Sequence, residues 1–252
     1  MKYFMAAFLV GLIALGAVAT QTSLFIVENI PVEVQIVNSG SIEHIVQQTV
    51  SAQILKNEKL FKNKSIWAVS LSKVQDVVAA EPWVQSIRIS RRLPNIVNVV
   101  VEPKRAVAML LVQKAKGLNP ELRALTQDGS VLKLPNSTAA LDVPIARGPM
   151  FAAETAEGTE ARAKLIEFIA SIPNEGSLST KNIAEITFTP EEGFSLALIP
   201  MKSTVLLGNE KIQTKVTRVS QVLDYLLAHQ LRGRVIDASF SKKVLVRLRK
   251  DP

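Results

Sequence analysis

The chain has 252 residues, of which 48% are hydrophobic, and it carries a net charge of +8 and no cysteine. This length and hydrophobic content allow one large folded domain or two small ones and exclude an intrinsically disordered chain. The lack of cysteine excludes disulfide bonds and thiolate metal sites, and the two histidines, His44 and His229, stand too far apart in sequence for a ligand pair, so we expect no metal site.

The positive charge is concentrated in the carboxyl-terminal part of the chain. Residues 202–252 contain 11 Lys and Arg against 4 Asp and Glu, whereas residues 24–103 contain 8 against 7. A basic region of this kind can meet nucleic acid, anionic lipid or an acidic protein segment, or it can form a solvated face. The sign of the charge alone does not choose among these.

Tyr3 to Ala19 is an uncharged apolar run that, at 1.5 Å per helical residue, reaches roughly 26 Å, close to the thickness of a hydrocarbon core. Lys2 precedes it and the next basic residue is Lys56, so the positive-inside rule puts the amino terminus in the cytoplasm and exports the rest of the chain. We predict that the run is retained as a single-pass signal anchor. The alternative is a signal peptide, cleaved at the Ala-Val-Ala sequence that ends at Ala19.

Residues 24–103 predict an α+β domain in the order strand, helix, helix, strand, strand, with both helices on one face of a three-stranded sheet. The first strand lies within Ser23–Val37, and Pro31 indicates that it is an edge strand. An apolar stripe from Ile42 to Thr49 predicts the first helix, and Ser70 is expected to cap the second. Between the helices, the residues expected to pack on the core are Leu60, Phe61, Ile66 and Trp67.

The stretch from Glu81 to Ala108 predicts the β-hairpin around which this domain is organised. Pro82 ends the preceding helix, the turn is Arg91–Asn95, and Pro103 ends the second strand. The period of two indicates that the inward-facing residues are Ile87, Ile89, Val97, Val99 and Val101. We predict that Trp83 is buried between the second helix and the sheet.

Residues 104–252 predict a second domain made mostly of strands, with two helices. The helices are Thr159–Ile172 and one that Asn209 caps and His229 ends. Asp128-Gly129 marks a hairpin turn, because glycine accepts positive φ, and residues 135–149 are expected to form a loop. The predicted strands are Val107–Gln113, Leu122–Thr126, Val131–Leu134, Ile183–Phe188, Phe194–Ile199, Ser203–Leu207, Arg234–Phe240 and Lys243–Lys250.

The last two predicted strands separate apolar from basic residues. Ile236, Ala238 and Phe240 are expected to share a face of the first. In the second, Val244, Val246 and Leu248 alternate with Lys243, Arg247 and Arg249. We predict that the final strand is a free edge, whose unpaired N–H and C=O groups are available to an extended partner segment, and that its basic face favours an acidic partner.

The sequence contains no catalytic motif. It has no glycine-rich phosphate loop, no Gly-x-Ser-x-Gly elbow and no His-Glu-x-x-His, and Glu191-Glu192 lies in a predicted turn where a solvated pair is expected. Only Tyr225 and Phe240 accompany the basic strands, too few aromatic rings for a nucleic-acid stacking platform. We therefore predict an exported interaction protein with no enzymatic activity, no cofactor and no small-molecule substrate.

Several short motifs carry a family resemblance. A helix runs into Pro-Trp-Val (82–84), a strand ends in Arg-Arg-Leu-Pro-Asn (91–95), a valine-rich strand follows, and then comes Glu-Pro-Lys-Arg-Ala-Val-Ala (102–108). This pattern resembles the POTRA module of the FtsQ/DivIB family of bacterial cell division proteins. The resemblance continues more weakly through the segment 126–131, Gly208 before a helix, and the closing strand pair. It implies a cytoplasmic stub and anchor (1–23), a POTRA domain (24–103) and a β-domain (104–252).

The resemblance implies a non-enzymatic divisome scaffold of the bacterial inner membrane, single-pass, with its carboxyl-terminal domains in the periplasm at the septum. Its implied partners are single-span division proteins of the FtsB/FtsL (DivIC/FtsL) type and other divisome components, through which it would link early and late division proteins and septal peptidoglycan synthesis. The residues expected to bind partners are Asp237, Phe240, Lys243, Leu245, Val246, Arg247, Leu248 and Arg249. A second candidate patch consists of Arg88, Arg91 and Arg92.

Two departures from the family pattern matter. Only Met1 and Lys2 precede the apolar run, where the family usually has a sizeable cytoplasmic tail, so the true start could lie upstream. Asp237-Ala238-Ser239-Phe240 stands where many members read Asp-x-Arg-Tyr, so a salt bridge from that arginine to a partner should be absent. The alternative function is a POTRA component of an outer-membrane assembly or secretion system, but the remaining chain is too short for the long barrel of such proteins.

Overall fold

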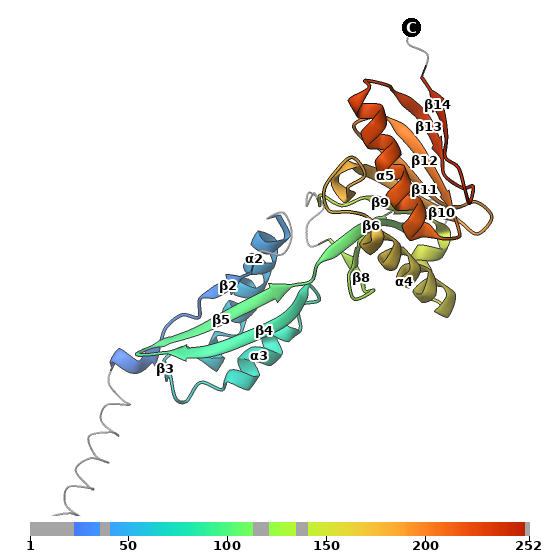
Figure 1. The fold of residues 1–252 in the computed structure, drawn as a ribbon. Coiled ribbons are helices and arrows are strands. Elements are labelled where there is room, and N and C mark those ends of the chain that lie inside the picture. Colours follow the sequence, from blue (N-terminus) through green and yellow to red (C-terminus); the bar gives the residue numbers. More distant parts are fainter. Residues whose placement is uncertain (1–22, 36–40, 113–120, 135–140, 250–252) are drawn as a thin grey trace, which may run out of the picture. The chain divides into compact units, whose positions relative to one another are not determined.

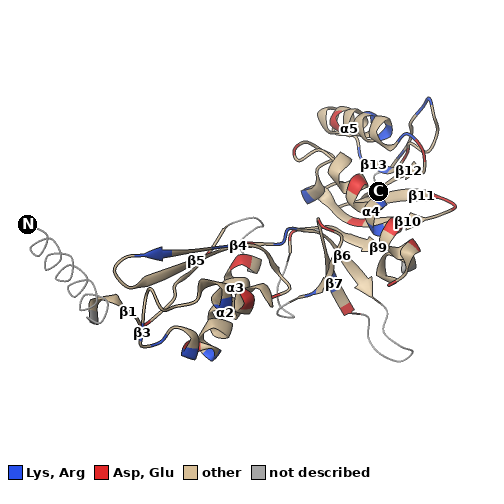
Figure 2. Ribbon diagram, turned by 90° about the horizontal axis from the view of Figure 1, so that it is seen from below, with Lys and Arg blue, Asp and Glu red and all other residues tan. Residues whose placement is uncertain are grey.

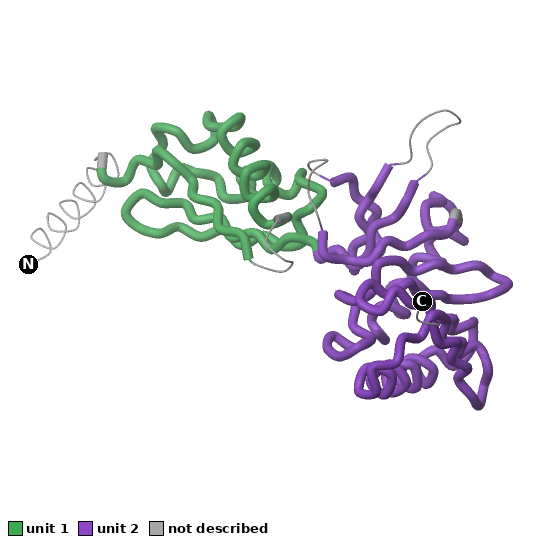
Figure 3. The backbone as a smooth tube through the Cα atoms, turned by 90° about the horizontal axis from the view of Figure 1, so that it is seen from above, with its two compact units in different colours: residues 1–104 green, residues 105–252 purple. Residues whose placement is uncertain are grey.

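The computed structural model of the chain describes residues 23–35, 41–112, 121–134 and 141–249. The chain divides into two compact units, residues 1–104 (unit 1) and residues 105–252 (unit 2) (Figure 3). Within the described ranges no helix is long and apolar enough to cross a membrane. The predicted anchor, Tyr3–Ala19, lies outside those ranges.

Unit 1 has a three-stranded sheet in the order β2-β5-β4, with two helices on one face (Figure 1). The strands are β2 (Val32–Val34), β4 (Val84–Arg92) and β5 (Ile96–Pro103), and the helices are α2 (Ser41–Lys56) and α3 (Leu71–Ala79). β4 and β5 form the predicted antiparallel hairpin, while β2 pairs with β5 in parallel. The predicted order of elements and the edge position of the first strand are confirmed.

The core of unit 1 follows the predicted periodicity on β5, whereas Ile87 and Ile89 on β4 are only half-buried. Val97, Val99 and Val101 on β5 are fully buried, and Trp83 is only 2% exposed. The helices contribute the buried residues Ile42, Val46, Val50 and Ile54 from α2 and Val74 and Val78 from α3. Burial of these valine and isoleucine side chains, each about 1.5–3 kcal/mol, is the main force that holds the helices on the sheet.

The predicted single strand within Ser23–Val37 is wrong, because the segment is broken in two. After a 3₁₀ turn, η1 (Ser23–Phe25), β1 (Ile26–Val27) pairs antiparallel with β3 (Lys64–Ser65), and β2 begins only at Val32. The break falls at Asn29-Ile30-Pro31, where the Asn29 side chain accepts a hydrogen bond from the Ile30 N–H at 2.9 Å. Local side-chain bonding and a proline without N–H both interrupt strand pairing.

The segment between α2 and α3 only partly meets the prediction. Phe61 and Ile66 are buried and hold this segment, which includes a second 3₁₀ turn, η2 (Glu58–Leu60), on the core. Leu60 is half-buried, and Trp67 is 54% exposed, so the expectation that Trp67 packs on the core is wrong. Ser70 does occupy the cap position of α3, but its side chain bonds Ser72 instead of a helix N–H.

Unit 2 is built on one mixed sheet of nine strands, in the order β14-β13-β12-β11-β10-β9-β6-β7-β8. Three neighbouring pairs are parallel, β6 with β9, β9 with β10 and β12 with β13, and the other pairs are antiparallel. The strands are β6 (Ala106–Val112), β7 (Glu121–Thr126), β8 (Val131–Lys133), β9 (Ile145–Arg147), β10 (Ile183–Thr189), β11 (Gly193–Leu198), β12 (Ser203–Gly208), β13 (Gly233–Asp237) and β14 (Leu245–Leu248).

Two helices, α4 (Ala156–Ser171) and α5 (Ile212–Ala228), pack with the sheet into one hydrophobic core. The predicted stripe of α4, from Ala161 to Ile172, is buried, and the rings of Phe168 and Phe194 stack at 4.2 Å between α4 and β11. On α5 the buried apolar residues are Val216, Val219, Leu223 and Leu226. Short 3₁₀ turns, η3 (Pro149–Ala152) and η4 (Thr180–Asn182), precede α4 and β10. With strands and helices in both units, the chain belongs to the predicted α+β class.

The predicted loop at residues 135–149 contains β9, a strand that the sequence does not reveal. Three residues are too few to show a period of two, and Pro144 precedes them. The strand forms because it lies between β6 and β10, where Met109 pairs with Ile145 and Glu185 pairs with the same residue from the other side. Its neighbours, distant in sequence, therefore decide its conformation.

The start of α5 also differs from the prediction. The N-cap is Lys211, with a left-handed φ of 52°, and not Asn209. The Asn209 side chain instead donates to the Pro190 carbonyl at 2.9 Å, which ties the start of α5 to the turn between β10 and β11. At the other end, His229 is the C-cap of α5 as predicted, and its Nδ1 lies 2.9 Å from the Tyr225 carbonyl.

Candidate partner-binding edge

β14 is the end strand of the nine-stranded sheet. It pairs antiparallel with β13 on one side, where Ile236 lies opposite Val246 and Asp237 opposite Leu245. Its other side has no strand neighbour among the described residues (Figure 1). The prediction that the final strand is an edge is therefore confirmed, and the strand presents a row of backbone groups to an incoming segment.

Two backbone hydrogen bonds show which N–H groups of β14 point inward. Arg249 N–H donates to the Arg232 carbonyl at 2.8 Å, so it points toward the β13 side. On β13, Ala238 N–H donates to Leu206 of β12 at 2.8 Å, so the N–H of Asp237 points the opposite way, toward β14. The N–H groups of successive residues point to opposite sides of a strand, and both observations give the same assignment of sides on β14.

By this assignment, Leu245 and Arg247 direct their N–H and C=O groups toward β13. Val246 and Leu248 direct theirs to the free side, because both backbone groups of a residue in an antiparallel strand point the same way. The free edge of β14 thus offers two donors and two acceptors at a spacing that matches every second residue of an added strand.

The side chains of β14 alternate between its two sides as predicted, but not all of those on the apolar side are buried. Val244 and Val246 pack against the core on the side of α5, and Leu245 and Arg247 are exposed on the other side. Leu248 shares the α5 side but is 51% exposed. It lines a groove and is not covered by the helix.

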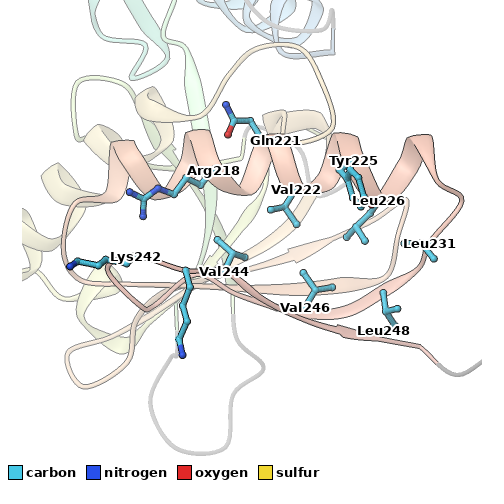
Figure 4. A pocket seen from close by; sticks show the side chains of 11 residues that line it. Arg218, Gln221, Val222, Tyr225, Leu226, Leu231, Lys242, Val244, Val246 and Leu248 are labelled. Atoms are coloured by element: carbon cyan, nitrogen blue, oxygen red, sulfur yellow. The ribbon is translucent and has the colours of Figure 1, made fainter.

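This groove, which we call the α5–β14 groove, has a volume of about 570 Å³ and an apolar floor (Figure 4). Arg218 and Lys242 lie at one end, and Leu231 and Leu248 at the other. It borders the strand edge directly, so a segment that pairs with β14 can place side chains in it. The lining residues are Arg218, Gln221, Val222, Tyr225, Leu226, Leu231, Lys242, Lys243, Val244, Val246 and Leu248.

Two basic residues of α5 hold the connection between β13 and β14 in place. Lys215 is only 5% exposed, and its Nζ donates to the carbonyls of Leu207 (2.8 Å) and Ser239 (2.9 Å). Arg218 donates to the Ser241 carbonyl at 2.7 Å. Sequence reasoning missed Lys215, whose only signal is a lysine one position before Val216 on the apolar stripe of the helix.

Two of the predicted partner-binding residues, Asp237 at the end of β13 and Phe240 in the connection, have different roles. Asp237 Oδ1 accepts hydrogen bonds from the Ser239 N–H (3.0 Å) and hydroxyl (2.6 Å), so this carboxylate shapes the turn. Phe240 is 42% exposed, and Lys243 Nζ lies 5.2 Å from its ring centre. The expectation that Phe240 shares the buried face of Ile236 and Ala238 is wrong, because β13 ends at Asp237 and the chain turns away.

The second predicted patch, in unit 1, is not a set of three free arginines. Arg88 and Arg92 are exposed on β4. The Arg91 guanidinium donates to the carbonyls of Ile66 and Val69, each at 2.9 Å, and so fixes the segment that precedes α3. Arg91 therefore has a structural role in this unit.

The described residues offer little for acid–base or metal chemistry. Within them, no group of three or more His, Asp or Glu side chains could hold a metal ion. In unit 1, burial raises the pKa of the Glu81 carboxyl above its ordinary value, a rise that a hydrogen bond involving the Trp83 backbone partly opposes. Gln53 donates to this carboxylate at 3.1 Å, which gives Glu81 a place in the packing of α2 against the hairpin.

The two units together define a POTRA-type module followed by a β-domain with a free edge strand, and comparison with known proteins agrees. A family model described as "POTRA domain, FtsQ-type" matches residues 41–102, and one described as "Cell division protein FtsQ/DivIB, C-terminal" matches residues 110–239. The second match covers more than half of the chain. The chain belongs to the FtsQ/DivIB family of cell division proteins.

Individual relatives are distant. The chain is 25% identical over 191 residues to the cell division protein FtsQ of Myxococcus fulvus, with 75% of this chain and 65% of that protein covered. It is 22% identical over 184 residues to FtsQ of Geotalea daltonii, covering 72% and 65%. A 57-residue stretch is 32% identical to DivIB of Clostridium acetobutylicum, and it covers 23% of this chain and 23% of that protein. The matched region spans just under two thirds of the length of the two FtsQ relatives.

Proposed function

We propose that this protein is a non-enzymatic scaffold of the divisome, held in the inner membrane by Tyr3–Ala19 with both units in the periplasm. It binds single-span division proteins of the FtsB/FtsL (DivIC/FtsL) type and other divisome components, and thereby links early and late division proteins and septal peptidoglycan synthesis. Family membership supports the role in division. The single structural observation that supports partner binding is the free edge of β14 beside the α5–β14 groove.

The binding mode follows from the geometry of that edge. An extended segment of a partner pairs with the outward N–H and C=O groups of Val246 and Leu248, which supplies affinity through main-chain hydrogen bonds. Alternate side chains of the added strand point to the α5 side, where an apolar residue fits the groove floor. A single edge therefore provides both pairing and side-chain selection.

The charge around the edge favours an acidic partner segment. Arg247 and Arg249 are exposed on β14, and Arg218 and Lys242 lie at one end of the groove. Charges of this kind increase the association rate more than they increase affinity, and salt screens them over about 8 Å at physiological ionic strength. Raising the salt concentration should therefore slow association more than it speeds dissociation.

A matched pair of proline variants tests the proposal. Val246→Pro removes an N–H that points to the free side, whereas Leu245→Pro removes one that bonds β13. We expect Val246→Pro to stay folded by circular dichroism and to lose the FtsB-type partner in a pull-down. Leu245→Pro should break the ladder and unfold unit 2. Leu248→Pro is a second outward variant whose side chain is more exposed than Val246, which separates loss of edge pairing from loss of packing.

The outcomes distinguish the binding modes. If Val246→Pro and Leu248→Pro both stay folded and bind with parental affinity, recognition does not use this edge, and Arg88 and Arg92 on β4 become the next surface to test. If all three variants unfold, β14 is not a free edge in solution.

A further inference from the structure

One end of unit 1 gathers exposed apolar side chains from segments that are far apart in sequence. Leu24 in η1 is 66% exposed, Trp67 after β3 is 54% exposed, and Leu93 in the β4–β5 turn is 58% exposed. η1, β1, β3 and the β4–β5 turn all lie at this end in two perpendicular views (Figures 1 and 2). Scattered exposed apolar residues are ordinary, but a group at one end of a small domain indicates a contact surface.

Hydrogen bonds join these segments. Ile66 N–H donates to the Phe25 carbonyl at 2.8 Å, which brings the residue after Leu24 beside the residue before Trp67. The Arg91 guanidinium donates to the Ile66 carbonyl at 2.9 Å, which brings the end of β4 to the same place. The hydrogen bonds of the fold therefore hold the segments that carry these side chains together.

Basic side chains lie in the segments that carry this group. Lys59, Lys62 and Lys64 are exposed in the segment before Trp67, and Arg92 is exposed at the end of β4, which Figure 2 shows in blue. The acidic residue in that segment, Glu58, is paired with Lys62 at 2.6 Å. A tryptophan and leucines with Lys and Arg in the same segments is the composition found where proteins meet the headgroup region of a bilayer.

The chain itself limits how far this end can be from a membrane. The apolar run ends at Ala19, and η1 begins at Ser23, four Cα steps later. Four residues span at most about 14 Å when fully extended. This limit applies to Leu24 and its neighbours, whereas residues at the other end of β4 have no such constraint.

We infer that this end of unit 1, formed by Leu24, Trp67, Leu93 and the basic residues around them, rests in the headgroup region of an anionic bilayer. The contact fixes how unit 1 stands on the membrane, which a single flexible connection to an anchor would leave free. The inference rests on the proposed membrane anchor. It adds a lipid contact to the protein contacts of the proposed function.

Fluorescence quenching by brominated lipids tests the inference, because the chain has only two tryptophans and Trp83 is 2% exposed. The full chain is reconstituted into vesicles of phosphatidylcholine and phosphatidylglycerol, with or without lipids brominated near the headgroup. We expect the parent to lose most of the Trp67 emission, and the Trp67→Phe variant to keep its remaining Trp83 emission.

A displaced tryptophan is the matched control. Gln85 is exposed near the start of β4, seven residues from Arg92 and so about 23 Å away along the strand. The double variant Trp67→Phe/Gln85→Trp carries one exposed tryptophan at the far end of unit 1, and we expect no quenching of it. Quenching in the parent no greater than in Trp67→Phe, or equal quenching at residues 67 and 85, overturns the inference.

Vesicle flotation separates this result from failure of the anchor. A chain that floats with the vesicles without quenching of Trp67 has an anchor but no contact, which overturns the inference alone. A chain that does not float has no anchor, which overturns the membrane tether of the proposed function and the lipid contact with it.

Discussion

At the scale of single residues, the two tryptophans show how position in the fold decides what an aromatic side chain does. Both were expected in the core of unit 1, yet only Trp83 is buried there. Trp83 follows Pro82 and comes directly before β4, and its side chain is buried in the core of unit 1. Trp67 lies in an irregular segment in which Ile66 and Val69 are the residues buried in the core, and its own side chain is exposed.

Trp83→Ala should lower the free energy of unfolding by about 3–5 kcal/mol, as large aromatic truncations in cores do. Chemical denaturation followed by circular dichroism measures this. Trp67→Ala is the control and should change stability by less than about 1 kcal/mol, because exposed substitutions have small effects. Equal losses for the two variants would contradict the assignment of Trp83 as the organising core residue.

At the scale of elements, the connection between β13 and β14 depends on α5. Lys215 is a buried cation bonded to two backbone carbonyls, one at the end of β12 and one in that connection. Charged donors make stronger hydrogen bonds than neutral ones, and they satisfy carbonyls that would otherwise be buried without partners. The edge strand is thus positioned by a residue that does not lie on it.

Lys215→Met keeps the length of the side chain but leaves both carbonyls without this donor. We expect a loss of about 1–3 kcal/mol in the free energy of unfolding. Weaker partner binding should accompany it, because the turn that carries Asp237 and Phe240 loosens; thermal unfolding and a binding titration measure the two effects. Lys164→Met removes an exposed ion pair with Glu160 on α4 and should be nearly neutral in both measurements.

At the scale of the whole molecule, the chain combines a POTRA-type unit, a β-domain whose sheet ends at the free edge of β14, and an apolar amino-terminal run in its sequence. Neither unit gathers a metal-ligand group within the described residues, whereas unit 2 presents pairing groups on β14. Membership in the FtsQ/DivIB family puts the chain among the cell division proteins.

The mature protein should retain Met1 to Ala19. The run is long enough to approach the thickness of a hydrocarbon core, and the first described element, η1, begins at Ser23, only a few residues later. The intact mass of the protein extracted from membranes measures this. A mature amino terminus at Thr20 would instead show a cleaved signal peptide and a protein free in the periplasm.

Features that depend on neighbouring residues in the chain were predictable from the sequence. The alternation of Val97, Val99 and Val101, the stop at Pro82 and the stripe of α4 each encode burial through a local period, and the structure confirms them. The order of the main elements in unit 1 follows from the same local patterns, whereas the edge position of the final strand was expected from its alternation together with the family resemblance. The family resemblance rested on motifs of this kind, and the family comparisons confirm it.

Only the tertiary structure decided features that depend on contacts between distant segments. β9 is a strand because β6 and β10 lie on either side of it, and Lys215 is a structural cation because the carbonyls of Leu207 and Ser239 meet at its tip. The direction of each N–H on β14 likewise follows from its pairing with β13. Hydrogen bonds between segments have no signal in local periodicity, because either partner alone is compatible with several conformations.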